Sequence, residues 1–116
     1  MSLNERYDND NIFAKIVRGE IPSVKLYETG DVLAFMDVFP QSEGHCLVIH
    51  KSATATNLFD VEKEDLATIM DAVQKVAHGV KNALNPDGIR IAQFNGAPAG
   101  QTVYHLHFHI IPVYEG

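Results

Sequence analysis

Cysteine is nearly absent from this 116-residue sequence, and tryptophan is absent altogether. The single cysteine, Cys46, cannot form a disulfide within the chain, which fits a reducing compartment such as the cytoplasm. No stretch approaches the roughly eighteen consecutive apolar residues of a membrane-spanning helix, so we expect no membrane partner. Basic residues are fewer than acidic ones, and the net charge of −6 argues against a nucleic-acid polymer as a partner.

The length and the composition both fit one globular domain. Apolar residues make up 46% of the chain and charged residues 21%, which are ordinary values for such a domain. A chain of this size has room for a single sheet and a layer of helices. The first residues are polar and lack the apolar centre of a secretion signal. We therefore predict an N-terminal tail at residues 1–10 and one domain at residues 11–116.

Two helices of different length are predicted. The short one covers residues 10–19, with Asp10 as its N-cap and Gly19 as its stop. The long one opens at Asp60 and ends at the turn formed by residues 85–88. Apolar residues at helical spacing form its core face: Leu66, Ile69, Met70, Val73, Ala77, Val80 and Leu84.

Five extended segments alternate with these helices. They cover residues 24–28, 32–37, 45–50, 89–94 and 103–111. The third segment is apolar throughout, which predicts a central strand. The expected fold class is α+β, an antiparallel five-stranded sheet with one long and one short helix, both on one side of the sheet.

The last segment carries the most unusual pattern. On a strand, His105, His107 and His109 share one face, while the residues between them are apolar. A solvent-facing stripe is the simplest interpretation. A metal site is a second one, although the outer two histidines lie about 13 Å apart, so a further ligand must come from elsewhere. Catalysis on an anion is a third, because one imidazole can attack while its neighbour donates a proton.

A loop of small residues, 95–102, leads into this strand. Its glycines and alanines allow main-chain N–H groups to approach a ligand closely. Asn95, Gln101 and Thr102 add neutral hydrogen-bonding groups. This combination suits a phosphate group held against a nucleophile better than it suits a bulky peptide.

The run from His105 to Ile111, histidine-apolar-histidine-apolar-histidine-apolar-apolar, resembles the signature of the histidine triad (HIT) nucleotide-binding family. The resemblance extends from about Asn11 to Val113 and is closest to the small dimeric nucleoside phosphoramidases. It implies a HIT-like domain, a homodimer and a purine nucleotide substrate. It implies no cofactor and no metal.

The resemblance also implies a catalytic role for four histidines. His107 would attack the α-phosphorus of a nucleotide, and the main-chain carbonyl of His105 would hold its other ring nitrogen. His109, with Gln101 and Thr102, would bind phosphate oxygens and help the leaving group depart. His45 would support His105 through a hydrogen bond. Water would then release a nucleoside monophosphate.

The same resemblance assigns the binding residues. Those implied to line the base and ribose are Ile12, Phe13, Ile16, Phe35 and Asp37, and those implied to hold the phosphate are Asn95, Gly100, Gln101 and Thr102. His50 stands where relatives usually have proline, and its position in the strand turns it away from His45, so we expect it to be peripheral. A dinucleoside polyphosphate hydrolase and a non-catalytic nucleotide-binding module remain as alternatives.

Overall fold

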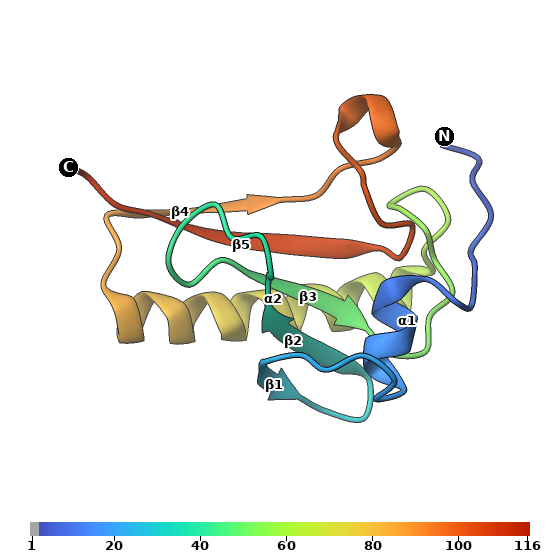
Figure 1. The fold of residues 1–116 in the computed structure, drawn as a ribbon, viewed down its shortest axis with the longest axis horizontal. Helices are drawn as coiled ribbons and strands as arrows, with labels where there is room; N and C mark the ends of the chain where they lie inside the picture. Colours follow the sequence, from blue (N-terminus) through green and yellow to red (C-terminus); the bar gives the residue numbers. More distant parts are fainter. Residues whose placement is uncertain (1–2) are drawn as a thin grey trace.

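The computed structural model describes residues 3–116 as an antiparallel five-stranded sheet with a helix on each face (Figure 1). Met1 and Ser2 of the predicted tail lie outside the described residues. The strands are β1 (Lys25–Glu28), β2 (Val32–Met36), β3 (Cys46–His50), β4 (Gly88–Ala92) and β5 (His107–Val113). They are arranged in the order β1-β2-β3-β5-β4, so the predicted α+β class and the central position of β3 are confirmed. The helices are α1 (Ile12–Val17), α2 (Lys63–Leu84) and a 3₁₀ turn, η1 (Ala97–Ala99).

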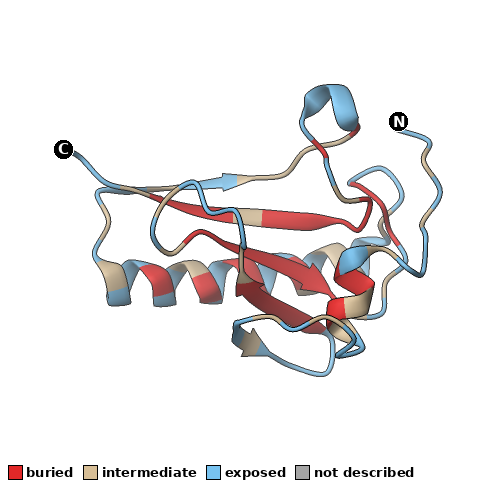
Figure 2. Cartoon of the chain, in the orientation of Figure 1, coloured by how far each residue is buried: buried red, intermediate tan, exposed pale blue. Residues whose placement is uncertain are grey.

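The two helices lie on opposite faces of the sheet, so the prediction that both lie on one side is wrong. Val48 of β3 packs in the cluster that includes Ile69 and Val73 of α2. Leu47 and Ile49 point the other way and pack against Phe13 of α1. The interior strands β2 and β3 are buried along their length (Figure 2). Strands buried on both faces need cover on both faces, and α1 supplies it on the second one.

The helix termini differ from the predicted ones by one to three residues. Asn11, not Asp10, caps α1, because its side-chain oxygen accepts the N–H of Ala14 at 2.9 Å. Asp60 does not open α2, which begins at Lys63. The Asp60 carboxylate instead accepts main-chain N–H groups of the preceding turn, at residues 56–57. Within residues 3–116, no helix is long and apolar enough to cross a membrane.

The core face of α2 is rotated slightly from the predicted stripe. Ile69, Val73 and Val80 are buried as expected, but Met70 is 39% exposed. Ala72 and Val76 occupy the core face as well, although the predicted stripe did not include them. Cys46 is fully buried, and burial raises the pKa of its thiol to about 11, in keeping with a small core residue.

The last strand begins later than predicted. Residues 103–106 are not part of β5, because the chain bends there and Leu106 donates its N–H to the carbonyl of Ala55 at 2.9 Å. Pro112 lies inside β5, opposite Ile89 of β4. Pairing of β3 with β5 extends only to Ile110, so one side of the strand lacks a partner at Pro112, where a missing N–H is tolerated.

Replacing Gly44 with alanine is expected to lower the free energy of unfolding by about 2 kcal/mol. Gly44 has a φ of +89°, and an added Cβ would overlap the side chain of Leu84. Replacing Gly79 with alanine is the matched control, since nothing lies within 4 Å of its added Cβ and it lies inside α2. That variant should gain about 0.5–1 kcal/mol in urea unfolding. Equal effects of the two substitutions would contradict this packing.

Candidate active site

His107 lies at the start of β5 and faces α1. It pairs with Ile49 of β3, and two residues further along His109 pairs with Leu47. We call the face of the sheet that carries Leu47, Ile49, His107 and His109 the histidine face. His107 is 7% exposed, and its Nδ1 lies 2.7 Å from the main-chain carbonyl of His105, as the resemblance implied. A carbonyl can only accept, so Nδ1 carries the proton and Nε2 keeps a free lone pair.

Phe13 of α1 fixes the position of the His107 ring. The two rings meet edge to face with their centroids 5.0 Å apart, and Phe13 also lies 6.1 Å from the His105 ring. Phe13 in turn packs edge-on against Phe35 of β2. The short helix therefore holds both histidine rings against the sheet, a role that requires it to lie on the histidine face.

His105 is a buried support for this arrangement. Its Nε2 lies 3.0 Å from the carbonyl oxygen of His50, and its Nδ1 lies 3.1 Å from the hydroxyl of Tyr7. The carbonyl must accept, so Nε2 carries the proton and the Tyr7 hydroxyl donates to Nδ1. Tyr7 was not among the predicted site residues, because no sequence pattern links an aromatic residue of the N-terminal segment to a histidine 98 residues away.

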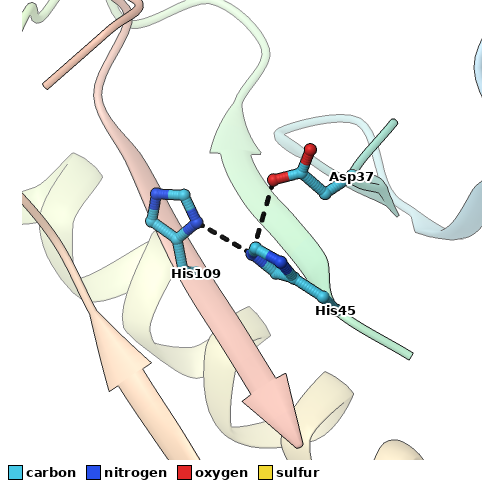
Figure 3. A group of neighbouring side chains, drawn as sticks. All are labelled: Asp37, His45 and His109. Carbon is cyan, nitrogen blue, oxygen red and sulfur yellow. Dashed lines mark hydrogen bonds and ion pairs between the residues drawn. The ribbon is translucent and has the colours of Figure 1, made fainter. Parts of the chain in front are cut away.

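His45 contacts His109 and not His105, so that part of the prediction is wrong. Its Nε2 lies 3.0 Å from His109 Nδ1 and 3.4 Å from the Asp37 carboxylate (Figure 3). The antiparallel register explains the correction. Leu47 of β3 pairs with His109, and Cys46 pairs with Ile110. His45 therefore lies beyond Ile110, at the end of β5 that is farther from His105.

Hydrogen bonds fix opposite tautomers on the two neighbouring histidines of β5. The main-chain N–H of Gln41 donates to His45 Nδ1 at 3.0 Å, so the proton of neutral His45 lies on Nε2. That Nε2–H donates to His109 Nδ1, which leaves the His109 proton on its own Nε2. His107 therefore offers a lone pair at Nε2, while His109 offers an N–H there.

Asp37, His45 and His109 are the described residues that could hold a metal ion, since their ligand atoms lie within 4.8 Å of one another. A histidine that binds a metal normally donates a hydrogen bond from its other ring nitrogen. The other nitrogen of His45 instead accepts the N–H of Gln41. The donor set therefore fits a hydrogen-bonded chain better than it fits a metal site.

Burial keeps all four rings neutral at neutral pH. It is the largest cause of the lowered pKa values of His45, His105 and His107. The pKa of His109 falls to about 4, first through burial and then through the neighbouring rings of His107 and His45. The lowered pKa of His107 favours the neutral ring, whose Nε2 lone pair is the nucleophile.

Lowering the pH from 7 to 5 is expected to reduce the free energy of unfolding. The four imidazoles titrate near 6.5 in the unfolded chain but at lower pH in the folded protein, so the unfolded state binds more protons. The contribution of these rings to the free energy of unfolding is thus at its maximum above about pH 6.5. It declines as the pH falls toward the folded-state pKa values, by up to about 1.4 kcal/mol per pH unit for each proton. Urea titrations at several pH values measure this slope. Equal stability at pH 5 and pH 7 would contradict it.

His50 is buried, so its expected peripheral position is wrong. It does point away from His45, but α2 covers that face, and His50 is only 6% exposed. Its Nδ1 accepts the N–H groups of Ser52 and Ala53, and its Nε2 lies 3.4 Å from Asp65 of α2. The ring fixes the end of β3, where the His50 carbonyl holds His105.

The loop implied to bind phosphate is held mainly by its own polar side chains. Gln101 is 4% exposed, and its amide nitrogen donates to the carbonyls of Thr56 and Val103. Both side-chain donors are thus used, which leaves none for a phosphate oxygen. Asn95 accepts the N–H of Leu58 and the side-chain amide of Gln93. Gly100 and Thr102 are the exposed members of the predicted set.

The residues implied to line the base form a layered wall. Phe13, Ile16 and Phe35 are buried together on the histidine face, whereas Ile12 is 46% exposed. Asp37 follows β2, and its side chain is 16% exposed with one oxygen accepting the N–H of Phe39. Of this set, Ile12 and Asp37 are therefore accessible to a ligand. The buried rings of Phe13 and Phe35 lie behind them.

Known proteins resemble this chain along most of its length. The HIT domain matches residues 18–116. The adenosine 5'-monophosphoramidase hnt1 of Schizosaccharomyces pombe is 46% identical over 101 residues, covering 87% of this chain and 72% of that protein. The adenylylsulfatase HINT3 of Arabidopsis thaliana is 38% identical over 104 residues, covering 90% of this chain and 52% of that protein.

Solved structures agree with these sequence matches. A Hit-like protein from Bartonella henselae has a TM-score of 0.91 and 58% identity, covering 95% of this chain and 83% of that one. The residues matched by the HIT domain span the positions of His45, His105, His107 and His109. The predicted recognition is therefore confirmed, and the chain belongs to the HIT family.

Proposed function

We propose that this protein is a nucleotide hydrolase that acts at the α-phosphate of a purine nucleoside phosphoramidate. The observation that carries the proposal is the pair of opposite tautomers on β5. His107 has a free lone pair at Nε2, and two residues along the same strand His109 has an N–H at Nε2. A nucleophile beside a hydrogen-bond donor is what displacement at phosphorus requires.

In the first step, His107 Nε2 forms a bond to the α-phosphorus, and the bond to the leaving nitrogen breaks. The His105 carbonyl accepts the Nδ1–H of His107 and so stabilises the positive charge that develops on the ring. The Nε2–H of His109 gives its proton to the leaving nitrogen, which departs as a neutral amine. The product of this step is a nucleotidyl-histidine.

In the second step, water attacks the same phosphorus and the bond to His107 breaks. One proton of the water restores the Nε2–H of His109, the nucleoside monophosphate leaves, and His107 regains its free lone pair at Nε2. Burial of His107 supports this cycle, because a dry site strengthens the interaction between the ring and the His105 carbonyl.

Binding of the nucleotide is assigned to the groups around these rings. The base would pack on Ile12 in front of the buried aromatic wall, and Asp37 would accept hydrogen bonds from the ribose hydroxyls. Thr102 and the main chain at Gly100 would contact phosphate oxygens, while Gln101 holds the loop in place. The relatives hnt1 and HINT3, named for activity on adenosine 5'-phosphate derivatives, support a purine nucleotide as substrate.

The proposed functional unit is a cytoplasmic homodimer. Met70 on α2 and Ile91 on β4 are 39% and 45% exposed, and with Ile89 they line one shallow groove. β4 is also an edge strand of the sheet. Exposed apolar groups beside an open strand edge suit a second copy of the chain. Sedimentation velocity over a range of concentrations tests this assembly.

Turnover assays with two substrates test the function. The purified protein is incubated with adenosine 5'-phosphoramidate and, separately, with diadenosine polyphosphates, and products are followed by ³¹P NMR. Release of AMP mainly from the phosphoramidate is the expected result. Preference for the diadenosine compounds would favour a dinucleoside polyphosphate hydrolase. Binding of AMP without any turnover would indicate a non-catalytic module.

A further inference from the structure

We propose that Tyr7 is a positioning residue for the nucleophile, and that it acts on His107 through His105. The inference rests on the proposed function and deepens it, because it identifies what holds the attacking ring in its reactive orientation. Three observations carry it: the absence of strand pairing at His105, the two hydrogen bonds that fix the His105 ring, and the course of the N-terminal segment, residues 3–10.

The main chain at His105 has no strand partner among residues 3–116. β5 begins at His107, which pairs with Ile49 of β3. The His105 carbonyl accepts the Nδ1–H of His107 at 2.7 Å and lies just before the strand, where the chain bends. Hydrogen bonds between strands fix the orientation of peptide groups inside a sheet. At His105, other contacts must do so.

Two hydrogen bonds to the His105 ring supply that fixation. Its Nε2–H donates to the carbonyl of His50 at 3.0 Å, and the hydroxyl of Tyr7 donates to its Nδ1 at 3.1 Å. His105 is 1% exposed, so its ring nitrogens depend on partners from the protein. The Tyr7 and His105 rings also pack together with their centroids 5.5 Å apart. Because His105 itself supplies the carbonyl that holds His107, anchoring its ring also anchors that carbonyl.

The N-terminal segment is held on both sides of Tyr7. On one side, the carbonyl of Leu3 accepts the side-chain amide of Asn57 at 3.0 Å. On the other side, the carbonyl of Asn9 accepts the guanidinium of Arg18 at 2.7 Å. The segment thus runs from the start of α1 past the loop that follows β3 and toward η1 (Figure 1). It forms neither helix nor strand, so these contacts set the position of the Tyr7 hydroxyl.

Removing the Tyr7 hydroxyl leaves Nδ1 of His105 without a donor at a buried position. A buried acceptor without a partner is unfavourable, so the ring is expected to move or to shift its proton between the two nitrogens. Either change weakens its bond to the His50 carbonyl and lets the His105 carbonyl move away from His107. The His107 proton is then held less firmly on Nδ1, and fewer molecules present the Nε2 lone pair in the attacking orientation.

Steady-state kinetics with adenosine 5'-phosphoramidate test this role. Tyr7→Phe keeps the aromatic ring and removes only the hydroxyl that bonds to His105, so kcat is expected to fall about tenfold while KM changes by less than about twofold. Tyr27→Phe is the matched control, because Tyr27 of β1 packs on the opposite face of the sheet, in the cluster beside α2. It should keep the wild-type kcat. An unchanged kcat in Tyr7→Phe, or an equal loss in Tyr27→Phe, would overturn the proposal.

A measurement without substrate separates this proposal from the proposed function. The rate at which the Nδ1–H of His107 exchanges with solvent, observed by ¹H–¹⁵N NMR, reports its bond to the His105 carbonyl. Exchange is expected to be about tenfold faster in Tyr7→Phe than in the wild type and in Tyr27→Phe. Such a difference supports the positioning role even if the wild-type protein turns over no nucleotide, a result that would refute the proposed function alone. Equal rates in all three proteins would overturn the positioning role even if turnover of the phosphoramidate is fast.

Discussion

Replacing His107 with alanine is expected to lower kcat for adenosine 5'-phosphoramidate by at least about a thousandfold, the scale on which loss of a nucleophile acts. The His107 ring provides the attacking lone pair at Nε2. Among the described imidazoles, His107 alone combines a free lone pair on one nitrogen with a proton held by a carbonyl on the other. The dissociation constant for AMP should change by less than about threefold, because the base and ribose contacts lie elsewhere. Stopped-flow assays and calorimetry measure the two quantities.

Two further variants show that such a loss is specific. His107→Asn keeps a donor for the His105 carbonyl and should preserve the fold, yet it should be as inactive as His107→Ala. His78→Ala removes an exposed histidine on α2 and should retain wild-type activity. Appreciable turnover by both His107 variants would rule out a covalent role for this residue.

Replacing His45 with leucine is expected to lower kcat by roughly thirtyfold to a hundredfold while leaving KM close to the wild-type value. His45 does not touch the reacting atoms. Its Nδ1 accepts the N–H of Gln41, so its own proton lies on Nε2. That Nε2–H donates to His109 Nδ1 and so holds the His109 proton on Nε2. Without it, His109 can adopt the other tautomer and present a lone pair to the phosphate, which repels it.

A matched variant and a spectroscopic readout separate this positioning role from simple loss of packing. His45→Gln keeps an amide donor that can reach His109 Nδ1, so it should recover much of the lost kcat. The ¹⁵N chemical shifts of the His109 ring should report a proton on Nε2 in the wild type and in His45→Gln, and a mixture of tautomers in His45→Leu. Unchanged His109 shifts in all three proteins would contradict the hydrogen-bond chain.

The sequence alone was sufficient to locate the histidine strand and the sheet. Alternation along the last strand identified a face with His107 and His109, and the apolar third strand proved to be central. These features follow from hydrophobic periodicity, which is a local property of the chain. Periodicity could not pair His45 with His109, because that contact depends on the register between β3 and β5, which is not a local property.

Other parts of the site depend on contacts that no local pattern encodes. The position of α1 on the histidine face follows from the burial of β2 on both sides, and Phe13 gains its contact with His107 only through that placement. Tyr7 meets His105 across 98 residues. Asp60 resembles a helix cap by residue type, but it closes the turn before the helix because that turn offers main-chain donors nearer to its carboxylate.

The central claim is that His107 becomes covalently attached to the nucleotide during turnover. The most direct measurement mixes the protein with adenosine 5'-phosphoramidate, stops the reaction within milliseconds in alkaline denaturant, and maps the label by peptide mass spectrometry. A nucleotidyl group on the peptide that contains His107, absent from His107→Asn, is the predicted result. Steady release of AMP with no labelled peptide at any time, or with the label on another residue, would contradict the account.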